Sequence, residues 1–376
     1  MKNIVIIGTD HYNTLGAVRM LGEIGIVDFE VIILNQKSKM IRWSKYVKKI
    51  YFFNDEQTVS FLNHREKKEN KAIIVACGDM AAEICSDNYD ILKDNYILPV
   101  SNKKGHTTFY MDKMQQKLLA QKVGFNVADG IVLNRQHNNT ITKMKLIQYP
   151  CITKSISTTK GGKSDIFICR QEDDVLNAIK NSKSEELVVE TLINKKNELC
   201  TFGVAIGNEI YIAGVAMYTN LPPNGDYGGC FDIFDDVFLS QYVDIQKMKS
   251  WVREINFQGV FCMEFVLDQN GKAYFMENNL RVSGFDYGMH KAGANLVKMW
   301  VEQRITRQEI KKTRCIVTMF DFKQQVLSKN LTLWVWFRQL LTCKVFFTWN
   351  KKDPLPLFGY FIDGIERKLK RLLKRV

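Results

Sequence analysis

Two glutamates and an asparagine in the C-terminal half of the chain have the spacing of a metal site built on a β-hairpin. Runs rich in Val, Phe, Tyr and Met between Gly259 and Arg281 flank Asn270-Gly271, a strong signal for a two-residue hairpin turn. The register set by that turn places Glu264 directly opposite Glu277. Asn279 projects from the same face as Glu277, because residues two apart on a strand share a face.

Carboxylates that face each other across a hairpin repel each other and destabilise it. This pair therefore predicts a bound cation that offsets the repulsion. Glu264, Glu277 and Asn279 offer only hard oxygen ligands, which suit Mg²⁺ or Mn²⁺ better than Zn²⁺. The alternative is an exposed hairpin whose acidic side chains point into water, and a loop of odd length would break the register. The rest of the chain must decide between these interpretations.

A basic, glycine-rich segment earlier in the chain could bind phosphate. A short strand at residues 149–154 ends in Lys154, and the loop Ser157–Ser164 follows it. Its glycines would let backbone N–H groups approach phosphate oxygens, and its lysines add positive charge. These loop residues are Lys160, Gly161, Gly162 and Lys163. The Walker A pattern is absent, so the loop taken alone is more typical of an ordinary hairpin loop.

The elements before this segment alternate as in an α/β protein. Mostly apolar runs at residues 2–7, Phe29–Leu34 and Ala72–Ala76 are typical of strands buried in a parallel sheet. Asp10 and Asp79 follow two of these strands and could touch a substrate at the strand ends. Later in the chain the pattern predicts one helix over Thr108–Gly124 and a helix-like or irregular segment over Val127–Leu133.

Composition places the chain among globular proteins of a reducing compartment. Its 376 residues can form two or three domains, and its hydrophobic content of 46% is ordinary. Its nine cysteines are spaced singly, which indicates reduced, buried thiols. The N-terminus runs directly into a strand, and no stretch of about 18 residues is apolar enough to span a bilayer. We therefore expect a cytoplasmic protein.

The strand-ending lysine, the glycine-rich loop and the two-carboxylate hairpin, in this order, resemble the ATP-grasp superfamily over about residues 1–312. The resemblance implies an α/β and α+β fold in which a Rossmann-like domain precedes a two-subdomain ATP-grasp fold that binds ATP and Mg²⁺ (or Mn²⁺). The implied parts are a Rossmann-like domain at 1–104, a small subdomain at 105–190, a large subdomain with the metal site at 191–312, and a basic amphipathic C-terminal extension at 313–376.

The resemblance also implies roles for individual residues. The implied nucleotide-binding residues are Lys113, Lys154, Lys160, Gly161, Gly162, Lys163, Glu190, Thr191, Ile193 and Glu198. Among these, the segment 190–193 would contact adenine and Glu198 the ribose. The implied metal ligands are Glu264, Glu277 and Asn279, and the implied catalytic residues are Lys154 and Arg281. Arg281 suits a bidentate contact with phosphate or carboxylate oxygens.

Segments 44–49 and 76–92 resemble a bacterial group of carboxylate–amine ligases, which includes D-aspartate ligases and proteins found with polysaccharide genes. Such an enzyme would phosphorylate a small-molecule carboxylate with ATP, after which an amine displaces the phosphate. Two alternatives stay open. One is a non-catalytic nucleotide-binding partner of a membrane polysaccharide assembly, and the other is a phosphotransferase that stops at a phosphorylated product.

The tail carries most of the excess positive charge. The formal net charge is +13, and residues 313–376 hold 13 Lys and Arg against four Asp and Glu. Leu331–Trp349 contains three of the six tryptophans, and Phe361–Val376 places apolar residues at helical spacing among basic ones. The pattern is equally consistent with contact between residues 331–376 and the inner membrane surface and with a helix packed on the enzyme body. No nucleic-acid-binding module accompanies the charge, so no nucleic-acid partner is expected.

Overall fold

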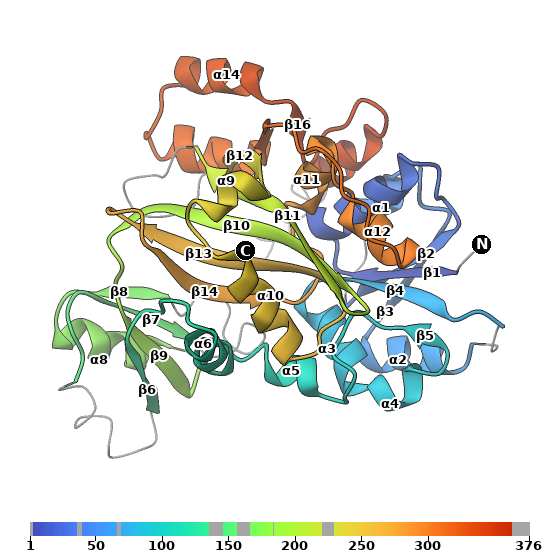
Figure 1. Ribbon diagram of the computed structural model, residues 1–376. Helices are drawn as coiled ribbons and strands as arrows, with labels where there is room; N and C mark the ends of the chain where they lie inside the picture. Colours follow the sequence, from blue (N-terminus) through green and yellow to red (C-terminus); the bar gives the residue numbers. More distant parts are fainter. Residues whose placement is uncertain are drawn as a thin grey trace, which may run out of the picture.

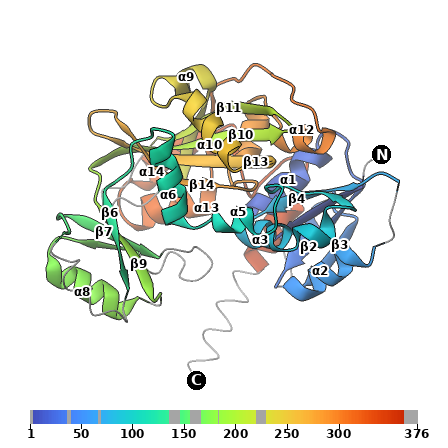
Figure 2. The same cartoon turned by 60° about the horizontal axis from the view of Figure 1, so that its bottom comes forward.

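The computed structural model describes residues 3–35, 40–65, 69–134, 146–155, 166–182, 184–219 and 229–362. Within these ranges the chain forms three β-sheets (Figure 1). A large sheet lies in the middle, and Figure 2 shows the small sheet and the first domain at opposite ends of the molecule. The predicted fold class is confirmed, because a parallel Rossmann-like sheet is followed by two antiparallel α+β parts.

The first sheet has five parallel strands in the order β3-β2-β1-β4-β5. Its strands are β1 (Ile4–Gly8), β2 (Phe29–Leu34), β3 (Lys49–Phe53), β4 (Ala72–Cys77) and β5 (Tyr96–Ile97). Its helical segments are α1 (Tyr12–Gly22), η1 (Ile41–Trp43), α2 (Asp55–Asn63), α3 (Asp79–Asp87) and α4 (Tyr89–Leu92). Alternate side chains of the central strands enter two separate hydrophobic clusters, one on each face. This explains why these strands are continuously apolar.

The second sheet is small and antiparallel, with the strand order β6-β9-β7-β8. It comprises β6 (Gly130–Asn134), β7 (Cys151–Ser155), β8 (Phe167–Cys169) and β9 (Glu186–Thr191), and α8 (Glu172–Asn181) packs on one face. The interpretation of Val127–Leu133 as helix-like or irregular is wrong, because residues 130–134 pair with β9. A short apolar run cannot be assigned by periodicity alone when its partner strand lies far along the chain.

The predicted helix Thr108–Gly124 is interrupted. It consists of α5 (His106–Phe109) and α6 (Lys113–Lys122), with a turn between them. The side chain of Asp112 caps α6 by accepting hydrogen bonds from the N–H groups of residues 114 (2.9 Å) and 115 (3.0 Å). This cap makes Lys113 the first residue of α6.

The large sheet has the strand order β14-β13-β10-β11-β12-β15-β16. Its strands are β10 (Lys195–Ile206), β11 (Glu209–Tyr218), β12 (Cys230–Asp235), β13 (Gly259–Asp268), β14 (Ala273–Asn279), β15 (Thr313–Ile316) and β16 (Val345–Phe346). The helices among them are α9 (Asp236–Ser240), α10 (Ile245–Glu254), α11 (Asp286–Ala292) and α12 (Leu296–Glu302). The last two strands come from the segment expected to be a C-terminal extension, so part of that segment completes the sheet.

The first domain and the large sheet share one hydrophobic core. Side chains of α1, α11 and α12 join residues of both sheets in a single cluster. The buried indole of Trp300 in α12 donates a hydrogen bond to the carbonyl of Ile74 in β4 (2.8 Å). The N–H of Val282, just after β14, donates to the carbonyl of Ala76 near the end of β4 (3.0 Å). The carboxyl end of β4 is therefore held beside the hairpin β13–β14.

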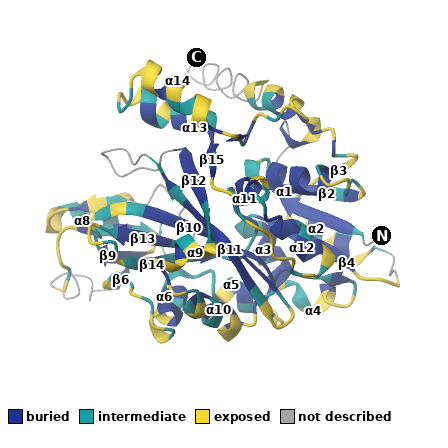
Figure 3. Cartoon of the chain, turned by 45° about the horizontal axis from the view of Figure 1, so that its top comes forward, coloured by how far each residue is buried: buried dark blue, intermediate teal, exposed yellow. Residues whose placement is uncertain are grey.

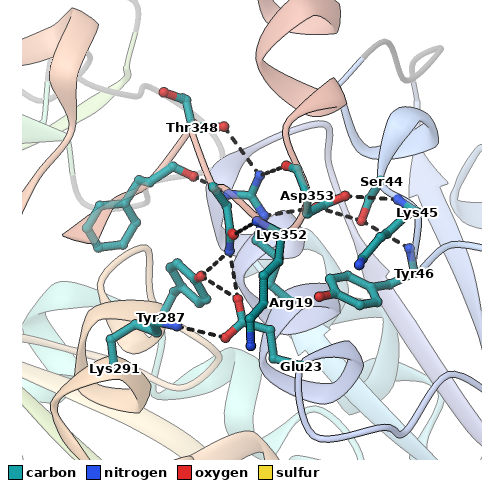
Figure 4. A network of polar contacts seen from close by, with 12 residues as sticks. Arg19, Glu23, Ser44, Lys45, Tyr46, Tyr287, Lys291, Thr348, Lys352 and Asp353 are labelled. Carbon is teal, nitrogen blue, oxygen red and sulfur yellow. Dashed lines mark hydrogen bonds and ion pairs between the residues drawn. The ribbon is translucent and has the colours of Figure 1, made fainter. Parts of the chain in front are cut away.

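A buried ion pair ties the described end of the chain to the first domain (Figure 4). Nε of Arg19 in α1 lies 3.0 Å from a carboxylate oxygen of Asp353, and neither side chain is exposed by more than 1%. Arg19 also donates to the carbonyls of Phe347, Thr348 and Asp353. Asp353 accepts a further hydrogen bond from the hydroxyl of Ser44 (2.8 Å). Residues 347–353 therefore form a strap across α1.

The rest of the described tail projects from the large sheet. Its helices include α13 (Thr318–Asp321), the π-helical segment η3 (Phe322–Leu327) and α14 (Leu333–Thr342), and residues 355–362 are helical as well. Figure 3 shows that much of α14 is exposed. Across the described ranges, no helix combines the length and apolarity needed to cross a bilayer. Most of the predicted basic helix Phe361–Val376 lies outside the described residues.

Candidate active site

The hairpin β13–β14 has a turn that differs from the predicted one. Leu267 pairs with Ala273, and the N–H of Asp268 donates a hydrogen bond to the carbonyl of Lys272 (3.0 Å), so residues 269–271 form the turn. Gly271 adopts φ +80°, a conformation that favours glycine. The side chain of Asp268 closes the turn by accepting hydrogen bonds from the N–H groups of residues 270 (2.9 Å) and 272 (2.8 Å). The predicted two-residue turn is therefore wrong.

A β-bulge restores the predicted opposition of the two glutamates. Phe265 pairs with Phe275, whereas Glu264 pairs with Glu277, so one strand gains a residue between the two pairs. This extra residue, Met276, offsets the shift that the turn introduces. The pairing of Glu264 with Glu277 is thus confirmed, although it depends on a bulge that the sequence pattern did not indicate.

The three predicted metal ligands come together at this bulge. Nδ2 of Asn279 donates hydrogen bonds to Oε1 of Glu264 (2.9 Å) and Oε1 of Glu277 (3.3 Å). The amide therefore offsets part of the repulsion between the carboxylates. Nη2 of Arg281 donates to Oδ1 of Asn279 (2.8 Å), which places the guanidinium at the edge of the same cluster.

The donor chemistry of this cluster fits a hard divalent cation. Glu264, Glu277 and Asn279 are each partly exposed and supply carboxylate and amide oxygens. Two thiols that the sequence analysis did not single out lie beneath them, with Sγ of Cys200 3.0 Å from Sγ of Cys262. Contact with Cys262 and burial raise the pKa of Cys200 well above its ordinary value. Both thiols are buried, whereas the oxygens of Glu264, Glu277 and Asn279 are partly exposed and are the ligands that suit a hard cation.

Lys154, one of the predicted nucleotide-binding lysines, lies in a largely buried cluster of charged side chains. Its Nζ is 3.2 Å from Oε2 of Glu190, and Lys117 of α6 forms an ion pair with the other oxygen of this carboxylate. Burial disfavours the ionised form, but the two lysines lower the pKa of Glu190 below its ordinary value. Two positive charges against one negative charge leave the cluster suited to a further anion, such as a phosphate.

Lys117 was missed by the sequence analysis. It lies one helical turn after Lys113, another predicted nucleotide-binding lysine. Burial lowers the pKa of Lys117, and the nearby charge of Lys113 contributes to this shift. Only 9% of the Lys117 side chain is exposed, because it points toward Glu190. The i, i+4 spacing from Lys113 on one helix face was the signal that could have identified it.

A cavity of about 320 Å³ lies between α6 and the small sheet. Lys117, Glu190 and Thr191 are among the residues that line it. The chain leaves β9 after Thr191, and residues 192–194, which include the predicted adenine contact Ile193, cross to the large sheet. The predicted phosphate loop, with Lys160, Gly161, Gly162 and Lys163, lies outside the described residues.

The predicted ribose contact, Glu198, lies near the start of β10. Nζ of Lys195 is 2.6 Å from its Oε1. Two residues further on, Cys200 pairs with Glu264 across β10 and β13. Glu198 therefore shares a face of the large sheet with Glu264, since alternate residues of a strand point the same way. The sheet places candidate nucleotide and metal contacts on one surface.

A buried glutamine ties α6 to β14. Nε2 of Gln116 donates to the carbonyl of Asn278 (3.0 Å), and the N–H of Asn278 donates to Oε1 of Gln116 (2.7 Å). Asn278 lies between Glu277 and Asn279. This pair of hydrogen bonds therefore sets the spacing between α6 and the hairpin β13–β14. A glutamine in a helix carries no local signal of this role, and the sequence analysis missed it.

Arg281 joins the hairpin to the first domain. Its Nε lies 3.0 Å from Oδ1 of Asp79, which begins α3 directly after β4. Burial works against the charge of Arg281, but the carboxylate of Asp79 raises the pKa of the guanidinium above its ordinary value. Arg281 therefore stays charged between Asp79 and Asn279. The expectation that Asp79 could lie at a substrate site is consistent with this position.

The start of α1 also approaches this region. A side chain at Gly284 would meet the ring of Tyr12, the first residue of α1, at 2.4 Å, so the backbone at Gly284 passes very close to this helix. The other predicted strand-end acid, Asp10, accepts hydrogen bonds from the N–H groups of residues 40 (3.2 Å) and 41 (3.1 Å). Asp10 therefore supports the chain that leads into η1.

No protein family model matches this chain. The 2-oxoglutarate carboxylase small subunit of Hydrogenobacter thermophilus is 24% identical to it over 292 residues, which are 70% of this chain and 58% of that protein. The chain thus spans less than two thirds of the length of this relative. A solved structure of the biotin carboxylase domain of the Hydrogenobacter thermophilus enzyme, with MgADP and bicarbonate, has a TM-score of 0.63 at 15% identity and covers 82% of this chain and 72% of that one.

Solved structures of ligases share the same architecture. N5-carboxyaminoimidazole synthetase of Staphylococcus aureus, in complex with ADP, has a TM-score of 0.65 at 16% identity, with 88% of this chain and 86% of that chain covered. The L-amino acid ligase of Bacillus licheniformis has a TM-score of 0.59 at 14% identity, with 82% and 75% covered. At these identities the likeness shows a shared fold.

Proposed function

We propose that this protein is an ATP-dependent ligase that joins a carboxylate to an amine through an acyl phosphate. The observation that carries the proposal is the position of Arg281, which contacts Asn279 of the carboxylate cluster on one side and Asp79 of the first domain on the other. A phosphoryl-transfer site beside the strand ends of a second domain would bring ATP and another substrate together.

In this proposal the charged side chains bind different parts of the substrates. Lys113, Lys117 and Lys154 hold the phosphates of ATP, because their cluster has an excess of positive charge. Arg281 holds the oxygens of the substrate carboxylate or of the transferred phosphoryl group in a bidentate contact. Mg²⁺ held by the predicted ligands of the hairpin would offset the charge of the β- and γ-phosphates.

The proposed reaction has two steps. An oxygen of the substrate carboxylate attacks the γ-phosphorus of ATP, the bond to the bridging oxygen breaks, and ADP leaves. The amine then attacks the acyl carbon, the carbon–oxygen bond to phosphate breaks, and the amine nitrogen loses a proton. The products are an amide, ADP and phosphate.

The proposal specifies the chemical class of both substrates and not their identity. Bicarbonate belongs among the carboxylates to be tested, because the curated relative is a carboxylase and one solved neighbour contains bicarbonate. Amino acids belong among the amines and the carboxylates, because another neighbour is an L-amino acid ligase. A role in cell-surface polysaccharide synthesis stays a prediction from the sequence resemblance.

The test is ADP release by the full chain with ATP and Mg²⁺ across paired carboxylates and amines. The carboxylate is labelled with ¹⁸O, so that transfer of the label to phosphate reports an acyl phosphate. Wild type is compared with Glu277→Ala. The matched control is Glu209→Ala, which removes an exposed carboxylate at the far end of the same large sheet.

We expect ADP release that needs both substrates, ¹⁸O in the phosphate, and a loss of about 100-fold or more in Glu277→Ala but not in Glu209→Ala. ADP release that needs the carboxylate alone and leaves a stable phosphorylated product would favour the phosphotransferase. ATP binding without ADP release for any pair would favour the non-catalytic partner.

A further inference from the structure

One face of α14 is apolar and exposed. Trp334, Phe337 and Leu341 recur at helical spacing, with exposures of 63%, 45% and 71%. The rings of Trp334 and Phe337 are stacked with centroids 6.3 Å apart, and the guanidinium of Arg338 lies 5.3 Å from the Trp334 ring. We refer to these four residues as the α14 stripe.

The opposite face of α14 holds the helix on the body of the protein. The indole of Trp336, 8% exposed, donates a hydrogen bond to Oδ2 of Asp321 (2.8 Å) and packs against the ring of Phe322. Asp321 also accepts a hydrogen bond from the N–H of Gly229 (2.7 Å). The helix is therefore anchored by one side, and the residues of the α14 stripe are exposed.

Exposed apolar side chains are concentrated in this part of the chain. Of the 25 large apolar side chains that are exposed in the described ranges, 13 lie between residues 319 and 362. Besides the α14 stripe they include Leu327, Leu333, Trp349, Phe358 and Phe361. A helix such as α14 that presents several large apolar side chains to solvent is typical of a site that meets a partner or a membrane.

The exposed charge in the same region is positive. Both acidic residues between 313 and 362, Asp321 and Asp353, are buried and hydrogen-bonded inward. The exposed charged side chains of this range are Lys323, Lys329, Arg338, Lys344, Lys351 and Lys352. In the sequence, residues 363–376 add six Lys and Arg against two acids. A stretch of chain whose exposed side chains are largely apolar or cationic complements an anionic surface.

We propose that this surface binds an anionic lipid bilayer, with the α14 stripe among the lipid headgroups and the basic side chains against lipid phosphates. Trp suits this interfacial depth, and Arg338 can bury its stem while its guanidinium stays polar. α14 is short, so binding needs the cations, each of which strengthens attachment about fivefold near an anionic surface. A second copy of this chain is a poorer occupant, since a symmetric dimer would bring the same positive charges together.

The experiment is flotation of the full chain with vesicles of phosphatidylcholine alone or with about one third phosphatidylserine. We expect binding only to the anionic vesicles, with release at high salt. The triple variant Trp334→Gln, Phe337→Gln, Leu341→Gln should bind about tenfold or more weakly. A control with the equally exposed Ile91→Gln, Leu176→Gln and Val237→Gln should bind as wild type does. Both variants should have the melting temperature of wild type, which shows that they are folded.

A second variant, Lys344→Glu with Lys351→Glu, tests the charge without altering the α14 stripe and should also lose binding. Failure of wild type to bind the anionic vesicles overturns the proposal, as does equal binding by the stripe variant. A third outcome would assign the surface to a second copy of the chain. In that case wild type does not bind lipid, light scattering shows a dimer, and only the stripe variant disrupts this dimer. None of these outcomes depends on the identity of the ligase substrates.

Discussion

At the level of single residues, the candidate site consists of charges that each have a defined partner. Glu264 and Glu277 share the amide of Asn279, and Arg281 extends the cluster toward the first domain. At the small sheet one carboxylate, Glu190, is shared by two lysines. Each cluster has a surplus of one sign, negative at the hairpin and positive at the lysines, which complements Mg²⁺ and phosphate respectively.

Substitution of Lys117 by methionine tests the lysine cluster. The change keeps the length of the side chain but leaves Glu190 with only Lys154 beside it. We expect ATP binding to weaken about tenfold or more, as measured by calorimetry with Mg²⁺ present. The control Lys122→Met, an exposed lysine of the same helix, should bind ATP normally. Equal affinity in both variants would remove Lys117 from the site.

Asp286 predicts how stability depends on pH. Burial raises the pKa of this carboxyl group to about 7, and its Oδ1 has no hydrogen-bond partner within the described structure. The unfolded chain loses this proton near about pH 4. The contribution of Asp286 to the free energy of unfolding is therefore largest below about pH 4, and it falls as the pH rises to about 7.

Asp286→Asn should remove this slope. Relative to wild type, the free energy of unfolding of the variant should rise by about 2–4 kcal/mol between about pH 4 and about pH 8. Urea unfolding of both proteins at several pH values measures the difference. Parallel stability curves for the two proteins would show that Asp286 does not titrate in this range.

At the level of elements, the site depends on how α6, the small sheet and the hairpin β13–β14 are spaced. α6 carries Lys117, which forms an ion pair with Glu190 of the small sheet, and its Gln116 bonds to the backbone of β14 at Asn278. The hairpin in turn is joined through Val282 to the end of β4. One helix and one hairpin therefore link the lysine cluster, the carboxylate cluster and the first domain.

Gln116→Ala tests this link. The change leaves the N–H and the carbonyl of Asn278 without their partner, and each buried orphan group costs about 1–3 kcal/mol. We expect a lower melting temperature and a higher KM for ATP, because α6 is no longer held at a fixed distance from β14. Gln246→Ala, an exposed glutamine of α10, is the control. A stability loss without any change in KM would limit Gln116 to a packing role.

At the level of the whole molecule, the strap at residues 347–353 joins the tail to the first domain. The ion pair of Arg19 and Asp353 is inaccessible to water, and the strap carbonyls satisfy the remaining donors of Arg19. The same tail supplies β15 and β16 to the large sheet. The strap packs on α1 of the first domain and two strands of the tail belong to the large sheet. The tail up to the strap is therefore part of the folded protein.

Asp353→Ala should destabilise the protein strongly. It leaves the guanidinium of Arg19 buried without a counter-charge, which costs about 3–5 kcal/mol. Asp90→Ala breaks an exposed pair with Lys93 and should cost less than about 1 kcal/mol. Denaturant unfolding of the two variants and wild type gives both values. A small loss in Asp353→Ala would mean that water or another group replaces the carboxylate.

The fold class could be predicted from the sequence because its signals are local. Apolar runs that are buried on both faces identify a parallel sheet without knowledge of the strand order. Turn residues and alternation likewise identified the hairpin and the face that carries Glu264, Glu277 and Asn279. The strand β6 was missed because a short run is ambiguous until its distant partner is known.

Residue type and spacing alone determined which oxygen ligands and which lysine, Lys154, are candidates for the site. Tertiary structure decided that a bulge keeps Glu264 opposite Glu277, that Lys117 is buried beside Glu190, and that Asp79 rather than Asp10 reaches Arg281. It also decided which face of α14 is anchored and which is exposed. The physical reason is that register, burial and charge pairing depend on neighbours far along the chain, whereas hydrophobic periodicity and turn chemistry depend only on adjacent residues.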